Sequence, residues 1–94
     1  MKEHELKTFP HYWDAVESGE KPFEVRRDDR GFQKGDILVL LRMRKTSAGI
    51  WEVEREFSSH KPIYVLRKKI TYILTGGQFG IEPGYVVMGL EDEK

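Results

Sequence analysis

The segment from residue 18 to residue 40, SGEKPFEVRRDDRGFQKGDILVL, concentrates side chains that can recognise anions and nucleobases. Lys and Arg bind phosphate groups, and Arg can do so through two parallel hydrogen bonds. A Glu carboxylate can accept a hydrogen bond from an exocyclic amine such as that of cytosine. Lys21, Glu24 and Arg26 bring these types together, and Arg27 and Arg30 border the turn that follows. The segment is therefore a candidate site for RNA or a nucleotide, with an internal ion-pair network that stiffens the turn as the alternative.

The same residues also allow a catalytic hypothesis. Lys21 and Glu24 could act as an acid/base pair in a small hydrolase whose substrate is a modified nucleoside or RNA. Other chemistries have little support, because the chain has no Cys and its three His residues lack the spacing of a zinc site. It contains no Gly-x-Ser-x-Gly elbow, and its GGQFG segment lacks the Lys-Ser/Thr of a phosphate-binding loop. We therefore expect neither a metal nor a cofactor, and whether the chain is an enzyme stays open.

The distribution of charge along the chain is uneven. The formal net charge is zero, but residues 21–69 hold 13 Lys and Arg against 7 Asp and Glu, whereas the two flanks hold 3 basic and 9 acidic residues. A basic middle between acidic ends is compatible with an anion-binding surface. A dipolar surface without a partner is the alternative.

Length and hydropathy limit the class of protein. Ninety-four residues predict one domain, residues 1–94, with no large internal chamber, because a chain of this size buries only about 60–65% of its unfolded surface. No apolar run of membrane-spanning length and no signal peptide are present. We expect a soluble, cytoplasmic protein that does not contact a membrane. The sequence leaves the oligomeric state open and is compatible with a monomer.

Two elements must position the charged segment. The spacing of Phe9, Tyr12, Trp13 and Val16 predicts an amphipathic helix whose aromatic stripe packs in the core. We expect Thr8 to cap this helix, Pro10 to lie in its first turn and Gly19 to end it.

The segment Pro22–Arg26 follows as a strand. Its alternation places Phe23 and Val25 on one face, where they hold the barrel, and Glu24 and Arg26 on the other, with Lys21 close by.

The remaining patterns predict further strands over His4–Thr8, Ile37–Met43, Ile50–Phe57, Ile63–Leu74 (one strand or two, with a bend near Arg67–Lys69) and Tyr85–Leu90. One N-terminal helix with about five or six strands indicates an α+β, mostly β chain folded as a small closed or nearly closed barrel. Four aromatic residues near strand ends or loops could stack on bases, with ordinary packing as the alternative: Tyr64, Tyr72, Phe79 and Tyr85.

Several motifs together resemble a small family of uncharacterised bacterial and phage proteins. These are H-x-L-K at His4, P-x-Y-x-x-x-V-x-x-G-x-K ending at Lys21, F-E-[IV]-R-x-x-D-R-x-F-x-x-G-D from Phe23 to Asp36, and the closing GGQFGIEPGYVVMGL. That family is related to the ASCH domain and belongs to the PUA-like superfamily. The resemblance implies a PUA-like barrel with an RNA- or nucleotide-binding cleft beside the first helix, and adds Lys7 to the candidate site residues Lys21, Glu24, Arg26 and Arg30.

The chain departs from this pattern in two places. Leu41–Arg44 replaces a Glu-containing turn, and 54–68 lacks an expected Thr-Gly-Arg. A related ASCH branch, which hydrolyses N4-acetylcytidine, pairs its Lys with a Thr three positions later, where this chain has Glu24. The resemblance therefore does not carry that activity over. Other ASCH branches are linked to RNA cleavage.

Overall fold

The computed structural model describes residues 1–93 as a mostly β protein with one short helix. In chain order the elements are β1 (Glu3–Thr8), α1 (Pro10–Glu17), β2 (Phe23–Arg27), β3 (Ile37–Lys45), β4 (Trp51–Val53), β5 (Val65–Thr75) and β6 (Tyr85–Asp92). The expected composition, one N-terminal helix and about five or six strands, is confirmed within the described residues, which form six strands.

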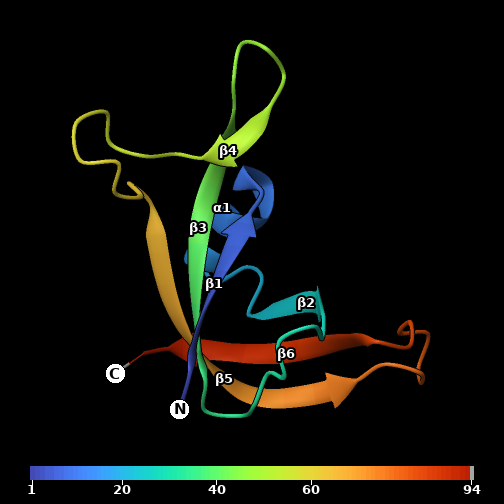
Figure 1. Ribbon diagram of the computed structural model, residues 1–94. Coiled ribbons are helices and arrows are strands. Elements are labelled where there is room, and N and C mark those ends of the chain that lie inside the picture. Colours follow the sequence, from blue (N-terminus) through green and yellow to red (C-terminus); the bar gives the residue numbers. More distant parts are fainter. Residues whose placement is uncertain (94) are drawn as a thin grey trace.

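The strands form one strongly curved sheet in the order β1-β3-β5-β6-β2, with β4 added to the far end of β3 (Figure 1). β1 runs parallel to β3, and all other neighbours are antiparallel. Within residues 1–93 no backbone ladder joins β1 to β2, so the sheet is open and these two strands are its ends. The expectation of a closed barrel is therefore not confirmed.

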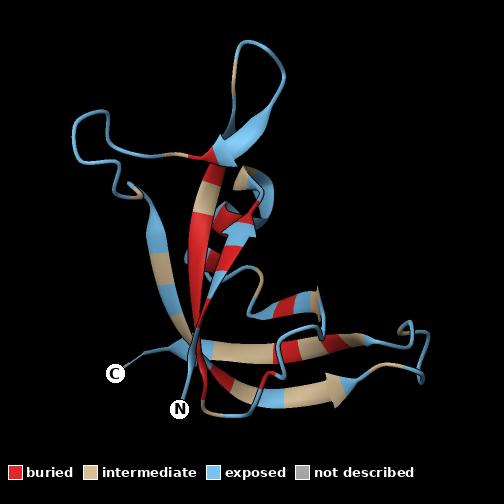
Figure 2. Cartoon of the chain, viewed as in Figure 1, coloured by how far each residue is buried: buried red, intermediate tan, exposed pale blue. Residues whose placement is uncertain are grey.

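The central strand β3 contributes to two apolar clusters. Its residues Ile37–Leu41 are buried without interruption, as the apolar run predicts. Because successive side chains point to opposite faces, Leu38 and Leu40 join the larger cluster, whereas Ile37, Val39 and Leu41 join the smaller one with Met43 and Val53. Figure 2 shows this buried stripe along β3, with α1 beside it. The core thus lies on both sides of one strand.

Helix α1 covers the larger cluster with only half of its predicted stripe. Trp13 and Val16 are buried, and the indole of Trp13 donates a 3.0 Å hydrogen bond to the carbonyl of Leu40. Phe9 and Tyr12 are instead 45% and 50% exposed, so the prediction that the whole stripe packs in the core is wrong. Because the helix has only eight residues, about two turns, only the side chains that point directly at the sheet are buried.

The ends of α1 also differ in part from expectation. Phe9 occupies the N-cap position and makes no capping hydrogen bond through its side chain. Thr8 does not cap the helix, because its hydroxyl donates to the carbonyl of Leu6 at 3.0 Å. Pro10 opens the helix, and Gly19, with a φ of 85°, follows its end as predicted. A bidentate pair between Asp14 and Arg42 fastens the helix to β3.

The later strands confirm the pattern but shift its limits. β4 covers only Trp51–Val53, because the chain leaves the sheet after Val53 and forms a loop that returns at Val65. β5 is a single strand whose irregularity lies between Ile70 and Tyr72, directly after the predicted Arg67–Lys69. No helix within the described part of the chain is long and apolar enough to cross a membrane.

A buried carboxylate closes the end of the sheet where β1 and β3 begin. Asp36 accepts hydrogen bonds from the ring of His4 at 2.9 Å and from the backbone N–H groups of Lys2 and Gln33. The ring of Phe32 packs edge-on against His4 at 4.8 Å. Burial alone would raise the pKa of Asp36, but these three hydrogen bonds hold that pKa below its usual range. The Gly35-Asp36 turn is thus tied to the N-terminal strand.

We predict that Asp36→Ala lowers the free energy of unfolding by about 2–4 kcal/mol, since it removes three hydrogen bonds from one partly buried cluster. Urea denaturation measures this change. Asp29→Ala is the matched control, because Asp29 is exposed and, among residues 1–93, has a single ion-pair contact, with Arg30 at 3.8 Å; we expect a change within about 0.5 kcal/mol. Equal stability of the two variants would contradict the role given to Asp36.

The lowered pKa of Asp36 makes a second prediction. Because the folded-state pKa lies below the unfolded value of about 3.9, the stability from the ionised carboxylate is complete above that pH and is lost as pH falls through the folded-state value. The difference in unfolding free energy between wild type and Asp36→Asn should therefore shrink below about pH 4. A difference that grows on acidification in that range would contradict this account.

Candidate functional site

Strand β2 presents its charged face to the interior of the fold. Glu24 is only 3% exposed and Arg26 is half-buried, whereas Phe23 and Val25 are exposed. The alternation is as predicted, but the prediction that Phe23 and Val25 hold the core is wrong. The reason lies in the tertiary fold: among the described residues β2 pairs with β6 alone, and on its inner side Arg26 finds polar partners at the edge of β1, the carbonyl of Lys7 and the hydroxyl of Thr8.

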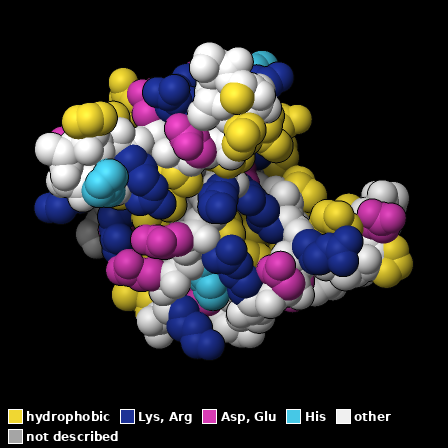
Figure 3. Space-filling view, turned by 45° about the horizontal axis from the view of Figure 1, so that its top comes forward, with side chains coloured by type: hydrophobic (Ala, Val, Ile, Leu, Met, Phe, Trp, Pro, Cys, Tyr) yellow, Lys and Arg dark blue, Asp and Glu magenta, His cyan; other side chains and the backbone are white. Residues whose placement is uncertain are grey.

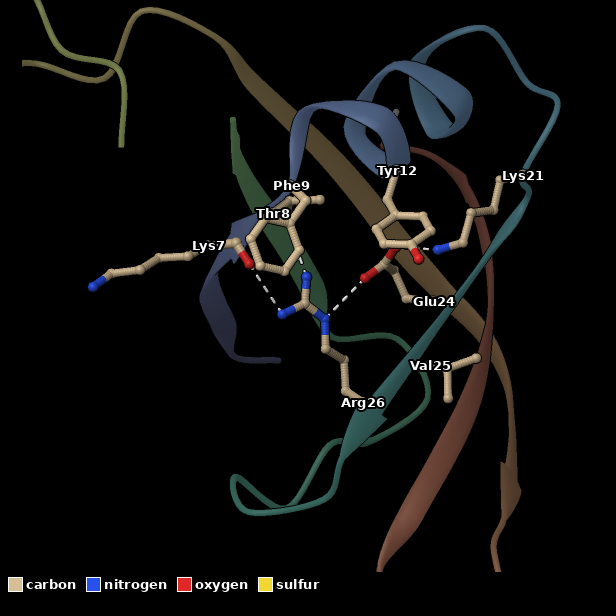
Figure 4. Close-up of a pocket in the computed structure, with 8 residues that line it drawn as sticks. All are labelled: Lys7, Thr8, Phe9, Tyr12, Lys21, Glu24, Val25 and Arg26. Carbon is tan, nitrogen blue, oxygen red and sulfur yellow. Dashed lines mark hydrogen bonds and ion pairs between the residues drawn. The ribbon is translucent and has the colours of Figure 1, made fainter. Parts of the chain in front are cut away.

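The carboxylate of Glu24 holds the two neighbouring cations. Its Oε1 accepts a hydrogen bond from the ammonium of Lys21 at 2.6 Å, and its Oε2 accepts one from Nε of Arg26 at 2.9 Å. Figure 4 shows the three side chains converging, with that of Val25 directed away. Lys21 reaches this point because the chain after Gly19 turns back, where the N–H of Lys21 donates to the carbonyl of Ala15. The three charged residues predicted to form a site therefore meet.

Two arginines bridge the ends of the open sheet. Arg26 donates to the carbonyl of Lys7 and to the hydroxyl of Thr8, each at 3.1 Å. Arg30 donates to the carbonyl of Glu5 at 2.6 Å. Carbonyls two residues apart in a strand point to the same side, so both guanidinium groups bind the same edge of β1. They take the place that the N–H groups of a neighbouring strand would occupy.

A cleft of about 410 Å³ lies at this seam, beside α1. The lining comprises Lys7, Thr8, Phe9, Tyr12, Lys21, Glu24, Val25 and Arg26 (Figure 4). The ammonium of Lys21 lies 5.3 Å from the ring centre of Tyr12 and 5.1 Å from that of Phe23. The cleft therefore combines a charged floor with exposed aromatic rings.

The other predicted site residues lie differently. Lys7 contributes its carbonyl to the seam, but its side chain points away from the cleft (Figure 4). Arg30 bridges the seam and does not line the cleft. The four aromatic residues proposed for stacking, Tyr64, Tyr72, Phe79 and Tyr85, are also absent from the lining.

Phe9 and Tyr12 line the cleft. Their spacing in the sequence instead predicts that they pack in the core. The only sequence signal for them is that they flank the first turn of a helix next to Thr8, a polar residue that ends the strand.

The spare hydrogen-bonding capacity of the cleft is concentrated on Lys21 and Glu24. The ammonium of Lys21 has three donors, of which Glu24 takes one, whereas Arg26 has committed three of its five. Each carboxylate oxygen of Glu24 has a second lone pair. No group of three or more His, Asp or Glu residues that could hold a metal ion occurs in residues 1–93. The site can thus donate to an oxygen and accept from an amine at adjacent positions.

The fold and the site define a small, mostly β protein with a charged cleft between its helix and the open edge of its sheet. The chain belongs to the family "Domain of unknown function (DUF3850)", whose profile matches residues 3–90. It is also similar to an uncharacterised 12.9 kDa protein encoded in the GpA 3′ region of Escherichia phage P2. The two are 36% identical over 76 residues, which cover 73% of this chain and 69% of the phage protein.

We predict that Arg26→Lys lowers the free energy of unfolding by about 1–3 kcal/mol, because one ammonium cannot reach Glu24, Lys7 and Thr8 together. Arg27→Lys is the matched control: Arg27 is exposed and, within residues 1–93, contacts the ring of Tyr85 rather than β1, so we expect at most about 0.5 kcal/mol. Urea denaturation compares both variants with wild type. If the two substitutions cost the same, the bridge across the seam is not structural.

Proposed function

We propose that this protein is a PUA-like, ASCH-related module that binds RNA by holding one nucleotide in the cleft beside α1. One observation carries the proposal: a buried carboxylate with an adjacent ammonium forms the floor of an open cleft whose rim bears two exposed aromatic rings. Buried ion pairs are costly to desolvate and are not needed to complete the apolar core. A ligand that contacts both Glu24 and Lys21 would account for this buried ion pair.

The chemistry of the cleft suits a nucleobase. Phe9 and Tyr12 can stack on a planar ring, as aromatic side chains do in RNA-binding proteins. Glu24 can accept from the exocyclic amine of a base, and the free donors of Lys21 can bind a carbonyl or a phosphate oxygen. A volume of about 410 Å³ lies within the usual range of small-ligand sites.

The bridge between β1 and β2 supports the PUA-like assignment. Arg26 and Arg30 bring the two ends of the open sheet to within hydrogen-bonding reach of one another through side chains. The sheet thereby curves almost back on itself, which is the arrangement expected of a nearly closed barrel with its binding cleft at the seam.

A second candidate function is hydrolysis of a modified nucleoside. The 2.6 Å contact between Lys21 and Glu24 is within the range in which an acid/base pair exchanges a proton. Incubating wild type and Lys21→Gln with modified nucleosides and RNA, followed by chromatography of the products, separates the two functions. Substrate left intact by wild type would remove the hydrolase hypothesis.

We predict that Lys21→Gln weakens binding of short fluorescent single-stranded RNAs at least about tenfold, because it removes a cation and its free donors. Gln retains one donor for Glu24, so the variant should remain folded. Fluorescence anisotropy between 50 and 200 mM salt should show the slope of log affinity against log salt reduced by about 0.7, the effect of one phosphate contact.

The control is Lys34→Gln, which changes an exposed lysine in the β2–β3 loop, outside the cleft lining. We expect it to leave affinity within about twofold of wild type, since its charge lies outside the cleft. Binding by wild type that does not depend on salt, or equal losses for Lys21→Gln and Lys34→Gln, would overturn the proposed function.

A further inference from the structure

A second, larger hollow of about 780 Å³ lies next to the cleft, between the β3–β4 hairpin and the loop that follows β4. Its lining includes three cationic side chains, Lys7, Arg44 and Arg55, and two exposed aromatic ones, Trp51 and Phe57. Apart from Lys7, which belongs to the H-x-L-K motif, these residues fall within or beside the segments that depart from the family pattern. The proposed function has no use for them so far.

The two hollows adjoin at Lys7. Lys7 lines both, because its carbonyl faces the cleft while its side chain extends away from it (Figure 4). Phe9 of the cleft and Trp51 of the second hollow are in edge-to-face contact, with ring centres 5.0 Å apart. A chain-like ligand can therefore contact aromatic rings in both hollows.

Phe57 is held outward by an ordered turn. Its side chain is 99% exposed, a costly position for a phenyl group. The turn is nevertheless well bonded: the N–H of Glu56 donates to the carbonyl of Lys61, that of His60 donates to the carbonyl of Glu56, and Arg55 donates to the carbonyl of His60. These hydrogen bonds hold the loop in a conformation that exposes Phe57, so its flat apolar ring is available to a ligand.

The charge of the second hollow favours an anionic ligand. The ammonium of Lys7 has no ion-pair or hydrogen-bond partner among the described residues. The lining has three cations against two carboxylates: Glu52 pairs with Arg44 at 3.7 Å, and Glu56, which accepts from the hydroxyl of Ser59, keeps its negative charge. Lys and Arg side chains gather around the middle of the face seen in Figure 3. The free positive charge of Lys7 lies where the two hollows join.

We propose that the second hollow binds the nucleotides next to the one in the cleft, so that a single strand of RNA runs from Tyr12 past Lys7 and Trp51 to Phe57. This inference rests on the proposed function. Aromatic rings alternating with cations are the means by which proteins bind unpaired bases and their phosphates without pairing. A duplex keeps its bases stacked inside and cannot use Trp51 or Phe57, so the ligand is single-stranded.

The test compares a fluorescent ten-nucleotide RNA of mixed sequence with unlabelled dinucleotides used as competitors. We expect wild type to bind the decamer far more tightly than a dinucleotide. Phe57→Ser should weaken decamer binding about tenfold and leave dinucleotide competition unchanged, because stacking on an exposed ring contributes only to the longer ligand. Lys7→Gln should lower the salt slope for the decamer by about 0.7.

The matched control is Phe79→Ser, because Phe79 is also highly exposed, at 84%, but lies at the tip of the β5–β6 hairpin on another part of the molecule (Figure 1). It should not change decamer binding. A duplex of the same sequence should compete poorly, and a single-stranded DNA decamer distinguishes recognition of the strand from recognition of the 2′-hydroxyl groups.

The outcomes separate the two proposals. If Lys21→Gln weakens both ligands while Phe57→Ser behaves as Phe79→Ser, the cleft binds a nucleotide and the inferred path is wrong. If wild type binds neither RNA, the proposed function fails and the inferred path fails with it.

Discussion

The carboxylate of Glu24 is the contact on which the seam of this fold depends. It is buried at the open edge of the sheet and balances Lys21 on one oxygen and Arg26 on the other. Held in this way, Arg26 can direct its remaining donors across to β1. Without these cations the buried carboxylate of Glu24 would be an unpaired charge, which costs several kcal/mol. The three side chains therefore stabilise the fold as a unit and also shape the floor of the cleft.

Two polar clusters hold the two ends of β1, one beside the start of its pairing with β3 and one at the seam, where no backbone ladder is formed among the described residues. At one end His4 and Asp36 join the start of β1 to the turn before β3, and at the seam two arginines bind the carbonyls of β1. Within the described residues every buried side-chain nitrogen or oxygen has a hydrogen-bond partner. An exposed strand edge invites pairing with another chain, and covering it with guanidinium groups removes that hazard while leaving space for a ligand. The contacts across the seam therefore stabilise the open sheet and also leave the space that forms the cleft.

Much of the fold could be predicted from local pattern. The period-two alternation in 23–26, the apolar run after Gly35 and the glycine after the helix correspond to elements that the structure contains. The candidate site was predicted in part: Lys21, Glu24 and Arg26 do meet in one cleft, whereas Arg30 binds β1 outside it. The closed barrel is not confirmed, because closure depends on pairing between strands that are distant in sequence.

What the sequence by itself determined was which side chains share a face, because the backbone geometry of strands and helices sets that locally. It determined that Glu24 and Arg26 point the same way, and that Phe9 and Tyr12 lie near Trp13. Only the tertiary structure decided which face is inside. Pattern alone assigns apolar residues to the interior, but β2 faces the polar edge of β1, so Glu24 is buried and Phe23 is exposed. Lys21 and Arg26 pair with the Glu24 carboxylate inside the same segment, and the complete sheet adds the hydrogen bonds from Arg26 to the carbonyl of Lys7 and the hydroxyl of Thr8 on β1.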